Sequence, residues 1–286
     1  MATMSNKIDF AIVISVNHAN PNGDPLNGNR PRINYDGLGE LSDVCIKRKI
    51  RNRLMQEGYS VFVQSDDNKV DSYTSLRARV EGEIGKEDQK DKQRFVRAAC
   101  EKWIDVRAFG QVFAYKGEKG GGDGASIPIR GPVTVQSAFS VVPVSDRVSS
   151  IQITKSVSGE GDGKKKASDT MGMKHRVDHG VYISYGSMNP QLADRTGFSK
   201  DDAIAVKKAL ATLFRNDESS ARPAGSMEVV RLYWWEHNSN IGQYSPARVH
   251  RSVAERVRVK DGVSEPTSIG EYVLPEKDES EQALPG

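Results

Sequence analysis

The stretch that most constrains this chain is DFAIVISV, residues 9–16, which is apolar at odd and even positions alike. Successive side chains of a strand point to opposite faces of a sheet, so such a strand needs cover on both sides. The segment therefore predicts a central strand, with Ile12 on one face and Val13 on the other. A chain of 286 residues, 37% of them hydrophobic and 28% charged, can supply that cover as one enlarged domain or two.

Composition and charge exclude several classes of protein. No apolar run approaches the roughly 18 residues of a membrane span, and the N-terminus lacks the pattern of a signal peptide. Cys45 and Cys100 are isolated thiols, which fits a reducing cytoplasm. Because 41 Lys and Arg face 38 Asp and Glu, any cationic surface must be local. We therefore expect a cytoplasmic protein with no membrane partner.

Turn-forming residues follow the first strand. Residues 17–34 contain six asparagines, three prolines and two glycines, which predicts a long irregular loop. Ser42 is a good N-cap for a helix that ends near Glu57, just before Gly58. The apolar stripe of this helix consists of Ile46, Ile50 and Leu54. The pattern therefore predicts an amphipathic helix directly after the asparagine-rich loop, the name used below for residues 17–34.

Further along, strands and helices alternate with long insertions. The patterns predict a strand at 59–64, a charged helical segment at 71–103, a glycine-rich loop at 116–126, a strand at 133–142 with Val135 and Phe139 on its apolar face, a polar excursion at 151–176, a strand at 177–185, a helix opened by a Ser199–Asp202 capping box, and a strand at 227–236. Without the insertions the order is strand, helix, strand, strand, helix, strand. That order is typical of a ferredoxin-like α+β fold.

The first helix carries the densest positive charge of the chain. Five cations fall within seven residues, and the only acids of the helix are Asp43 and Glu57. The cations are Lys47, Arg48, Lys49, Arg51 and Arg53. A cationic face without acids repels itself unless a polyanion such as a nucleic acid neutralises it. The pattern indicates a phosphate-binding helix, with a solvated basic face as the alternative.

The polar excursion holds the second concentration of cations. These are Lys155, Lys164, Lys165, Lys166, Lys174 and Arg176. Glycines at 159, 161 and 163 separate them into two groups, and the segment has little apolar surface to bury. It is either a disordered loop or an arm that becomes ordered on a partner. Met171 and Met173 could wedge against a base or simply pack.

Common catalytic and cofactor motifs are missing from the sequence. The run SGEGDGKKK departs from a P-loop, because a P-loop needs glycine at Ser158 and Ser or Thr at Lys165. His175 and His179 have the spacing of helical metal ligands, but no third ligand lies nearby in sequence. We therefore expect no catalytic residue, no cofactor and no metal. Trp234 and Trp235 point to opposite faces of their strand, and we expect at least one of them in the core, although the face of Arg231, Tyr233 and Trp235 could stack on RNA.

Several segments together resemble a known family. NPNGDPLNGNRPR at 20–32 is followed by SDVCIKRKIRNRL at 42–54, and the pair is similar to the backbone subunit of the type I CRISPR surveillance complex Cascade, a RAMP-superfamily protein. DVRAFGQVF at 105–113, RGPVTVQSAFS at 130–140 and MGMKHRVDHGVY at 171–182 also resemble that family, nearest its type I-C branch. The resemblance extends from residue 9 to about residue 238.

The resemblance implies a ferredoxin-like palm with a helical insertion and a projecting thumb hairpin. The implied divisions are 1–58, 131–144 and 178–274 for the palm, 59–130 for the insertion, 145–177 for the thumb and 275–286 for a flexible acidic tail. It also implies copies that polymerise as a helical filament along CRISPR RNA in antiviral defence. Each copy would hold the guide backbone for pairing with target DNA, beside other Cascade subunits.

The resemblance and the residues agree on where RNA would bind. The residues implied are Asn22, Asn27, Asn29, Arg30, Arg32, Lys47, Arg48, Arg51, Lys155, Lys174, His175 and Arg176. Lys, Arg and Asn side chains hold phosphates without reading bases, as a coat for any guide requires. Two alternatives stay open. One is an endoribonuclease that cuts target RNA with Asp162 or Asp169, and the other is a single-stranded RNA binder that acts alone.

Overall fold

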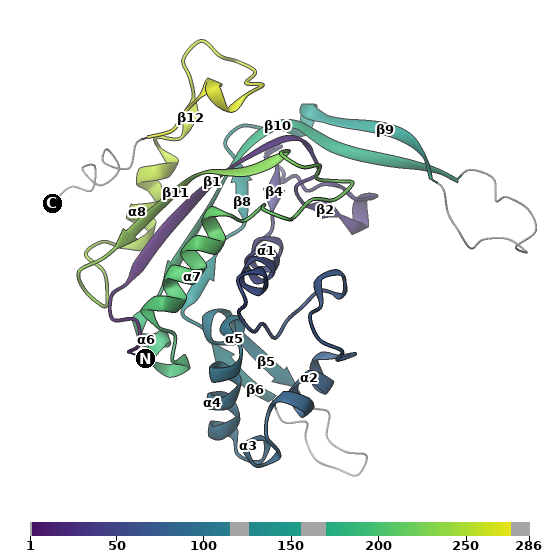
Figure 1. The fold of residues 1–286 in the computed structure, drawn as a ribbon. Coiled ribbons are helices and arrows are strands. Elements are labelled where there is room, and N and C mark those ends of the chain that lie inside the picture. Colours follow the sequence, from purple (N-terminus) through teal and green to yellow (C-terminus); the bar gives the residue numbers. More distant parts are fainter. Residues whose placement is uncertain (1, 115–125, 156–169, 276–286) are drawn as a thin grey trace, which may run out of the picture.

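The computed structural model of the chain describes residues 2–114, 126–155 and 170–275 and shows a mixed α/β protein built on one large antiparallel sheet (Figure 1). The main strand order is β11–β1–β10–β8–β4, and β7 and β9 also pair with β10. The strands are β1 (Ile8–Ala19), β4 (Glu40–Leu41), β7 (Val133–Val135), β8 (Ala138–Ser140), β9 (Val148–Lys155), β10 (Thr170–Met188) and β11 (Met227–Glu236). Every one of these pairings is antiparallel.

Strand β1 lies between the two longest partners in the sheet. Ile12 is paired with Ser184 of β10 on one side and with Leu232 of β11 on the other. Both faces of β1 are packed, since Ile12 and Val13 are each fully buried in different apolar clusters. The prediction of a central strand covered on both sides is confirmed.

Helices α1 (Asp43–Gln56), α6 (Pro190–Thr196) and α7 (Lys200–Ala211) lie on the first face of the sheet. The Ser42 hydroxyl accepts a hydrogen bond from the Cys45 amide at 3.3 Å, so it caps α1 as predicted. Ile46, Ile50 and Leu54 are fully buried against the sheet. The predicted capping box of Ser199 and Asp202 is also present at the start of α7. Local sequence signals thus place both helices correctly.

The second face of the sheet is covered by the C-terminal part of the chain. Helix α8 (Pro246–Ala254) and the short strands β12 (Arg258–Val259) and β13 (Tyr272–Val273) pack on it. Tyr233 and Trp235 are buried there, 2% and 6% exposed, so the expectation of a core tryptophan is confirmed and the alternative that this face stacks on RNA is wrong. Trp234 points to the other face and stacks on Phe10, with ring centroids 5.7 Å apart, as the predicted alternation requires.

The insertion, residues 59–130, forms a separate layer beside α1 (Figure 1). It consists of α2 (Leu76–Glu83), α3 (Lys86–Lys90), α4 (Lys92–Lys102), α5 (Ile104–Phe109), β5 (Gly110–Ala114) and β6 (Ser126–Arg130). Its own core contains Phe62, Phe95, Trp103 and Phe113, whose rings contact one another. The predicted glycine-rich loop lies outside the described residues, except for Ser126.

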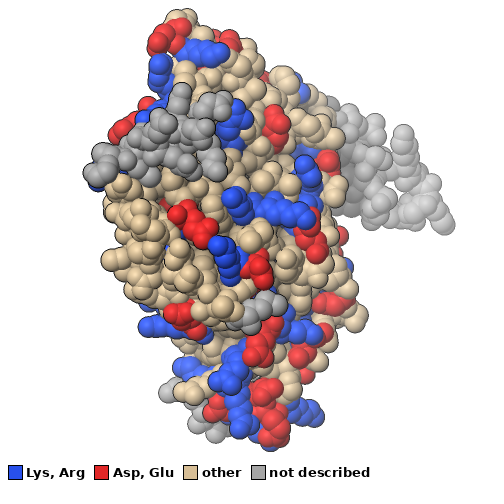
Figure 2. All heavy atoms as spheres, turned by 60° about the vertical axis from the view of Figure 1, so that its left-hand side comes forward, with Lys and Arg blue, Asp and Glu red and all other residues tan. Residues whose placement is uncertain are grey.

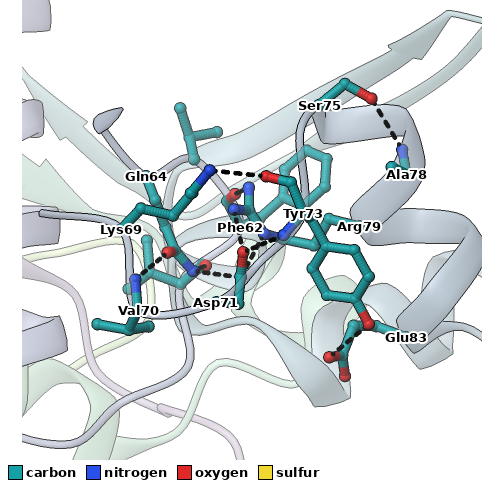
Figure 3. A network of polar contacts seen from close by, with 12 residues as sticks. Phe62, Gln64, Lys69, Val70, Asp71, Tyr73, Ser75, Ala78, Arg79 and Glu83 are labelled. Carbon is teal, nitrogen blue, oxygen red and sulfur yellow. Dashed lines mark hydrogen bonds and ion pairs between the residues drawn. The ribbon is translucent and has the colours of Figure 1, made fainter. Parts of the chain in front are cut away.

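The predicted strand at 59–64 is wrong, because these residues pair with no other strand. Side chains hold this segment instead (Figure 3). The Arg79 guanidinium donates to both carboxylate oxygens of Asp71, at 2.8 and 2.9 Å, and to the Phe62 carbonyl at 2.7 Å. Arg79 is only 4% exposed. Its side chain therefore forms a buried link between α2 and an irregular segment that makes no strand-to-strand hydrogen bonds.

Strands β9 and β10 form a hairpin that projects from the sheet (Figure 1). Their register extends from the Val148–Val177 pair at the base to the Lys155–Thr170 pair. This hairpin consists of residues 148–155 and 170–177, so of the two alternatives for the polar excursion the disordered loop is wrong at its described ends. Residues 156–169, which include the predicted lysine cluster at 164–166, lie outside the described part.

Two further details differ from the sequence predictions. The strand predicted at 133–142 is divided into β7 and β8, and Phe139 is 39% exposed while Ala138 is buried. The asparagine-rich loop is shorter than predicted, because β1 continues to Ala19. It contains β2 (Gly23–Asp24), the 3-10 turn Pro25–Asn27 and β3 (Arg30–Pro31). Within the described ranges, no helix has the length and apolar character to cross a membrane.

Candidate nucleic-acid interface

The five cations of α1 all have partners inside the fold. The contacts are Lys47 Nζ to Asp43 Oδ2 at 3.0 Å, Arg48 Nη1 to the Val63 carbonyl at 2.8 Å, Lys49 Nζ to Asp217 Oδ2, Arg51 Nε to Asp105 Oδ2 at 2.9 Å, and Arg53 Nη2 to Glu57 Oε1 at 3.0 Å. The prediction of an unpaired cationic face is therefore wrong. It failed because Val63, Asp105 and Asp217 come from other elements, which the sequence of the helix alone cannot show.

Burial distinguishes these cations from an open phosphate-binding face. The side chains of Lys49, Arg53 and Arg51 are only 4%, 8% and 13% exposed. Burial lowers the pKa of Lys49, and the nearby Asp217 carboxylate opposes that shift. Burial also lowers the pKa of Arg48, and the Arg51 charge adds to the effect. Lys47 differs from these residues, because its side chain is 25% exposed and that of its partner Asp43 is 40% exposed. A phosphate could therefore replace the Asp43 carboxylate as the partner of Lys47.

The asparagines mainly shape the loop and attach it to α1. The Asn22 side-chain oxygen accepts hydrogen bonds from the Ser42 amide and hydroxyl, both at 2.9 Å. Asn20 Nδ2 donates to the Asn29 carbonyl at 2.7 Å. Asn29 has a φ of +59°, a left-handed conformation that asparagine tolerates better than most residues. Asn27 is exposed at the tip of the loop.

The loop also contacts the base of the hairpin, 120 residues further along the chain. Arg30 Nη1 donates to the Ser150 hydroxyl at 3.3 Å, and that hydroxyl lies 2.7 Å from His175 Nδ1. Ser150 and His175 are directly opposite each other in the β9–β10 ladder. The structure therefore brings together Arg30 and His175, two residues that the sequence singled out separately.

The remaining predicted cations lie along the loop and the hairpin. Arg176 Nε is 3.4 Å from Asp178, and Arg32 Nη2 is 3.6 Å from Asp24. Lys174 has no polar partner among the described residues. Lys155 is the last residue of β9, and its side chain is not among the parts that the structure describes.

The pKa values of two groups in this region, His175 and Asp178, are shifted from their ordinary values. Burial and the adjacent Arg30 charge lower the pKa of His175, so its imidazole is neutral near pH 7. Burial opposes ionisation of Asp178, yet hydrogen bonds from Ser149 and His18, together with the Arg176 charge, bring its pKa below the ordinary value. The base of the hairpin thus combines half-buried cations with one carboxylate.

The segment that links α7 to β11 completes the interface, and sequence reasoning missed it. The Asn20 and Asn17 amides donate to the Ala221 and Ser226 carbonyls, both at 2.8 Å. Arg222 lies there, 28% exposed, with Nε 3.1 Å from Asp217. Its sequence context, ESSARPAG, is that of an ordinary turn, so no local signal marks it.

Four polar atoms in this region are buried without a hydrogen-bond partner among the described residues. They are Asn20 Oδ1, Arg32 Nε, Arg176 Nε and Ser226 Oγ. Buried polar atoms ordinarily have partners, and each exception needs an explanation. Because these atoms are buried, a ligand could bind them only after the side chains moved.

The site offers little for metal or nucleophilic chemistry. Within residues 2–114, 126–155 and 170–275, no three His, Cys, Asp or Glu side chains are grouped so that they could hold a metal ion. His179 Nδ1 lies 2.6 Å from the Asn17 side-chain oxygen instead. Burial raises the pKa of the Cys100 thiol to about 12, which keeps it protonated and unreactive. On the face shown in Figure 2, positive and negative side chains are intermixed.

Comparison with known proteins adds family information to this geometry. The family model described as CRISPR-associated protein Cas7 matches residues 6–276. A CRISPR-associated protein Cas7 from Haloferax volcanii is 26% identical over 253 residues, which cover 84% of this chain and 74% of that protein.

Three solved structures with chains that match this one come from CRISPR assemblies. Chains of two CRISPR RNA-guided surveillance complexes, one of them in a pre-nicking state, match with TM-scores of 0.46 at 15% and 14% identity. The matches cover 90% and 80% of this chain and 78% and 77% of theirs. A chain of the type III-B Cmr-beta complex bound to cognate target RNA has a TM-score of 0.43 at 11% identity, covering 81% of this chain and 61% of its own.

Proposed function

This chain belongs to the Cas7 family of CRISPR-associated proteins, and we propose that it is a backbone subunit that binds the guide RNA of a CRISPR effector complex. The family match over residues 6–276 is the observation that carries the proposal. The curated Haloferax volcanii relative, similar over 84% of the chain, supports it. A protein that coats guides of any sequence needs phosphate contacts without base readout, and the interface described above offers such groups.

We assign the chain to the type I-C branch of the RAMP superfamily, with a ferredoxin-like palm. The strand order β11–β1–β10–β8 and the helices α1 and α7 on one face support that palm. The palm would comprise 1–58, 131–144 and 178–274. The projecting β9–β10 pair would be the thumb, within 145–177, and residues 59–130 the helical insertion.

In this proposal the guide follows the seam between the asparagine-rich loop, the base of the hairpin and the α7–β11 segment. The groups that would meet it are Asn27, Arg30, Arg32, Lys47, Lys155, Lys174, His175, Arg176 and Arg222. Asn22 and Asn29 would act by holding the loop in place. Copies would polymerise along the guide in the cytoplasm, contact other Cascade subunits and present the guide to target DNA.

Charge reversal tests the proposal directly. Arg30→Glu with Lys174→Glu should abolish assembly on guide RNA, because both side chains would then repel phosphates. A matched control is Lys86→Glu with Arg94→Glu, which reverses two exposed cations of the insertion. Sedimentation and electron micrographs of the co-purified particle would show the result. Normal particles from the first variant would contradict the proposal, and a chain that never multimerises on RNA would favour a binder that acts alone.

We propose a scaffold without catalytic activity. Asp162 and Asp169, the acids of the cleavage alternative, lie outside the described residues. Assembled particles incubated with complementary RNA and Mg²⁺ should leave that RNA intact. Cuts at defined positions that disappear in Asp162→Asn or Asp169→Asn would establish the nuclease instead.

A further inference from the structure

We propose that Arg48 and Arg51 support guide assembly by fixing the insertion against α1, and that neither side chain contacts the RNA. Helix α5 would be the joint, with Asp105 and Arg107 as positioning residues. This inference rests on the proposed function, because it concerns how the same particle assembles. Arg48 and Arg51, which the family resemblance implied as RNA-binding residues, thereby have a positioning role instead.

Helix α5 is attached by ion pairs to two helices of the first face, to α1 through its acid and to α7 through its base. Asp105 of α5 accepts from Arg51 Nε of α1 at 2.9 Å. Arg107 of α5 donates to both oxygens of Asp202 of α7, at 3.0 and 2.7 Å. An acid and a base two residues apart therefore reach two different helices. This arrangement fixes both the position and the direction of a six-residue helix.

The same carboxylate also organises the segment that has no strand partner. Asp105 Oδ1 accepts from the Phe62 amide at 2.7 Å, and Oδ2 accepts from the Val63 amide at 3.1 Å. Arg48 Nη1 donates to the Val63 carbonyl at 2.8 Å. Arg79 of α2 donates to the Phe62 carbonyl (Figure 3). Arg48, Arg79 and Asp105 thus satisfy the four backbone groups that a neighbouring strand would otherwise pair.

The Arg51–Asp105 pair is poorly suited to exchange with a phosphate. Asp105 is 1% exposed and Arg51 is 13% exposed. The Arg51 guanidinium also lies over the Phe109 ring, 5.1 Å from its centroid. If Arg51 turned outward to a phosphate, the buried Asp105 carboxylate would keep its two amide donors but lose its counter-charge, which is costly. The exposed Lys47–Asp43 pair carries no such penalty.

The salt dependence of RNA binding separates positioning from phosphate contact. For single strands, each lost phosphate contact flattens the slope of log K against log salt by about 0.7. We expect Arg51→Met to lower the affinity of the assembled chain for guide RNA and to leave this slope unchanged. Arg30→Gln is the control at a proposed phosphate contact, and it should flatten the slope. If Arg51→Met flattens the slope as much as Arg30→Gln does, the inference is overturned.

A second variant applies if Arg51→Met fails to fold. Asp105→Asn removes the counter-charge and leaves Arg51 in place, so a phosphate-binding Arg51 would be released and RNA binding would be equal or tighter. We expect weaker assembly and faster proteolysis within 59–130. The double variant Arg51→Asp with Asp105→Arg exchanges the two charges and should restore assembly in part. If residue 51 contacted a phosphate, an aspartate at that position would repel it and assembly would not be restored. Equal or tighter binding in Asp105→Asn would overturn the inference.

The control variants keep the two proposals distinguishable. If Arg30→Gln leaves affinity and slope at wild-type values, the proposed guide interface fails. If Arg30→Gln flattens the slope and Arg51→Met does the same, the interface stands and only the positioning role fails.

Discussion

The two concentrations of positive charge in this chain differ in what they contact. On α1, Lys49 and Arg51 are paired with carboxylates of other elements and are almost buried. Beside the base of the hairpin, Arg30 of the asparagine-rich loop donates to the Ser150 hydroxyl. Lys174, on the hairpin itself, has no polar partner in the described part of the chain. The comparison teaches that a dense run of cations in a sequence does not by itself mean free charge. What matters is where the acids of distant segments lie in the fold.

The strongest test of this contrast is the removal of the Asp105 carboxylate. Asp105→Ala leaves Arg51 without its counter-charge and two amides without an acceptor, so we expect a loss of about 3–5 kcal/mol in the free energy of unfolding. Urea denaturation measures it. Asp43→Ala, which opens the exposed pair with Lys47, should cost about 0.3–0.5 kcal/mol. Equal losses would show that α1 is not divided into internal and external cations.

Removal of charge at the hairpin base should act on RNA affinity and leave stability almost unchanged. Arg30→Gln with Lys174→Gln should weaken binding on the order of tenfold per lost phosphate contact. The slope of log K against log salt should flatten by about 1.4 for the two contacts together. Filter binding at several salt concentrations measures both quantities. A double variant that unfolds more readily but binds RNA normally would reverse the comparison.

The N-cap of α1 connects the two regions, so its removal sharpens the contrast. Ser42 caps the Cys45 amide and donates to the Asn22 side chain. Ser42→Ala should cost about 1 kcal/mol of unfolding free energy. Ser42→Asp, which keeps a cap acceptor, should restore most of that stability. It should also repel the Asn22 oxygen, because the hydroxyl donor is gone. Thermal denaturation of the three chains ranks them, and equal midpoints would mean that the cap contributes nothing.

The smallest expected effect is the pH dependence of RNA binding through His175. Its pKa in the free protein is lowered, so the imidazole is neutral near pH 7. A phosphate nearby favours the protonated form, so binding would take up a proton, and affinity should rise a few-fold as the pH falls from about 7 to about 5.5. His175→Gln should lose this rise. An unchanged pH profile in that variant would separate His175 from the RNA.

Local signals in the sequence identified much of the fold. Capping residues and apolar spacing placed α1 and α7, and the two-sided apolar pattern of residues 9–16 placed β1 at the centre of the sheet. These features depend on neighbours within a few residues. The strand predicted at 59–64 was wrong because its backbone groups are satisfied by Arg48, Arg79 and Asp105, which periodicity does not report.

The candidate site was predicted less completely, because its contacts join distant segments. Arg51 and Asp105 are 54 positions apart, and Lys49 and Asp217 are 168 apart. The same reason explains why Arg222 was missed, since only the folded chain brings it beside Asn20. The family resemblance predicted a general location, which stays a prediction, and the contacts of the individual cations required the structure.

Strand β10 belongs to the central sheet along Val177–Met188 and to the hairpin along Thr170–Val177. One continuous strand therefore connects the hairpin to the core, with its pairing partner changing from β9 to β1 at Val177. Seven residues of strand span roughly 23 Å, so a tilt of about 10° at Val177 would swing Thr170 by roughly 4 Å. A neighbouring molecule that displaces the hairpin would therefore transmit force to the central sheet through β10. In the other direction, a small change in core packing would produce a larger displacement at the far end of the hairpin.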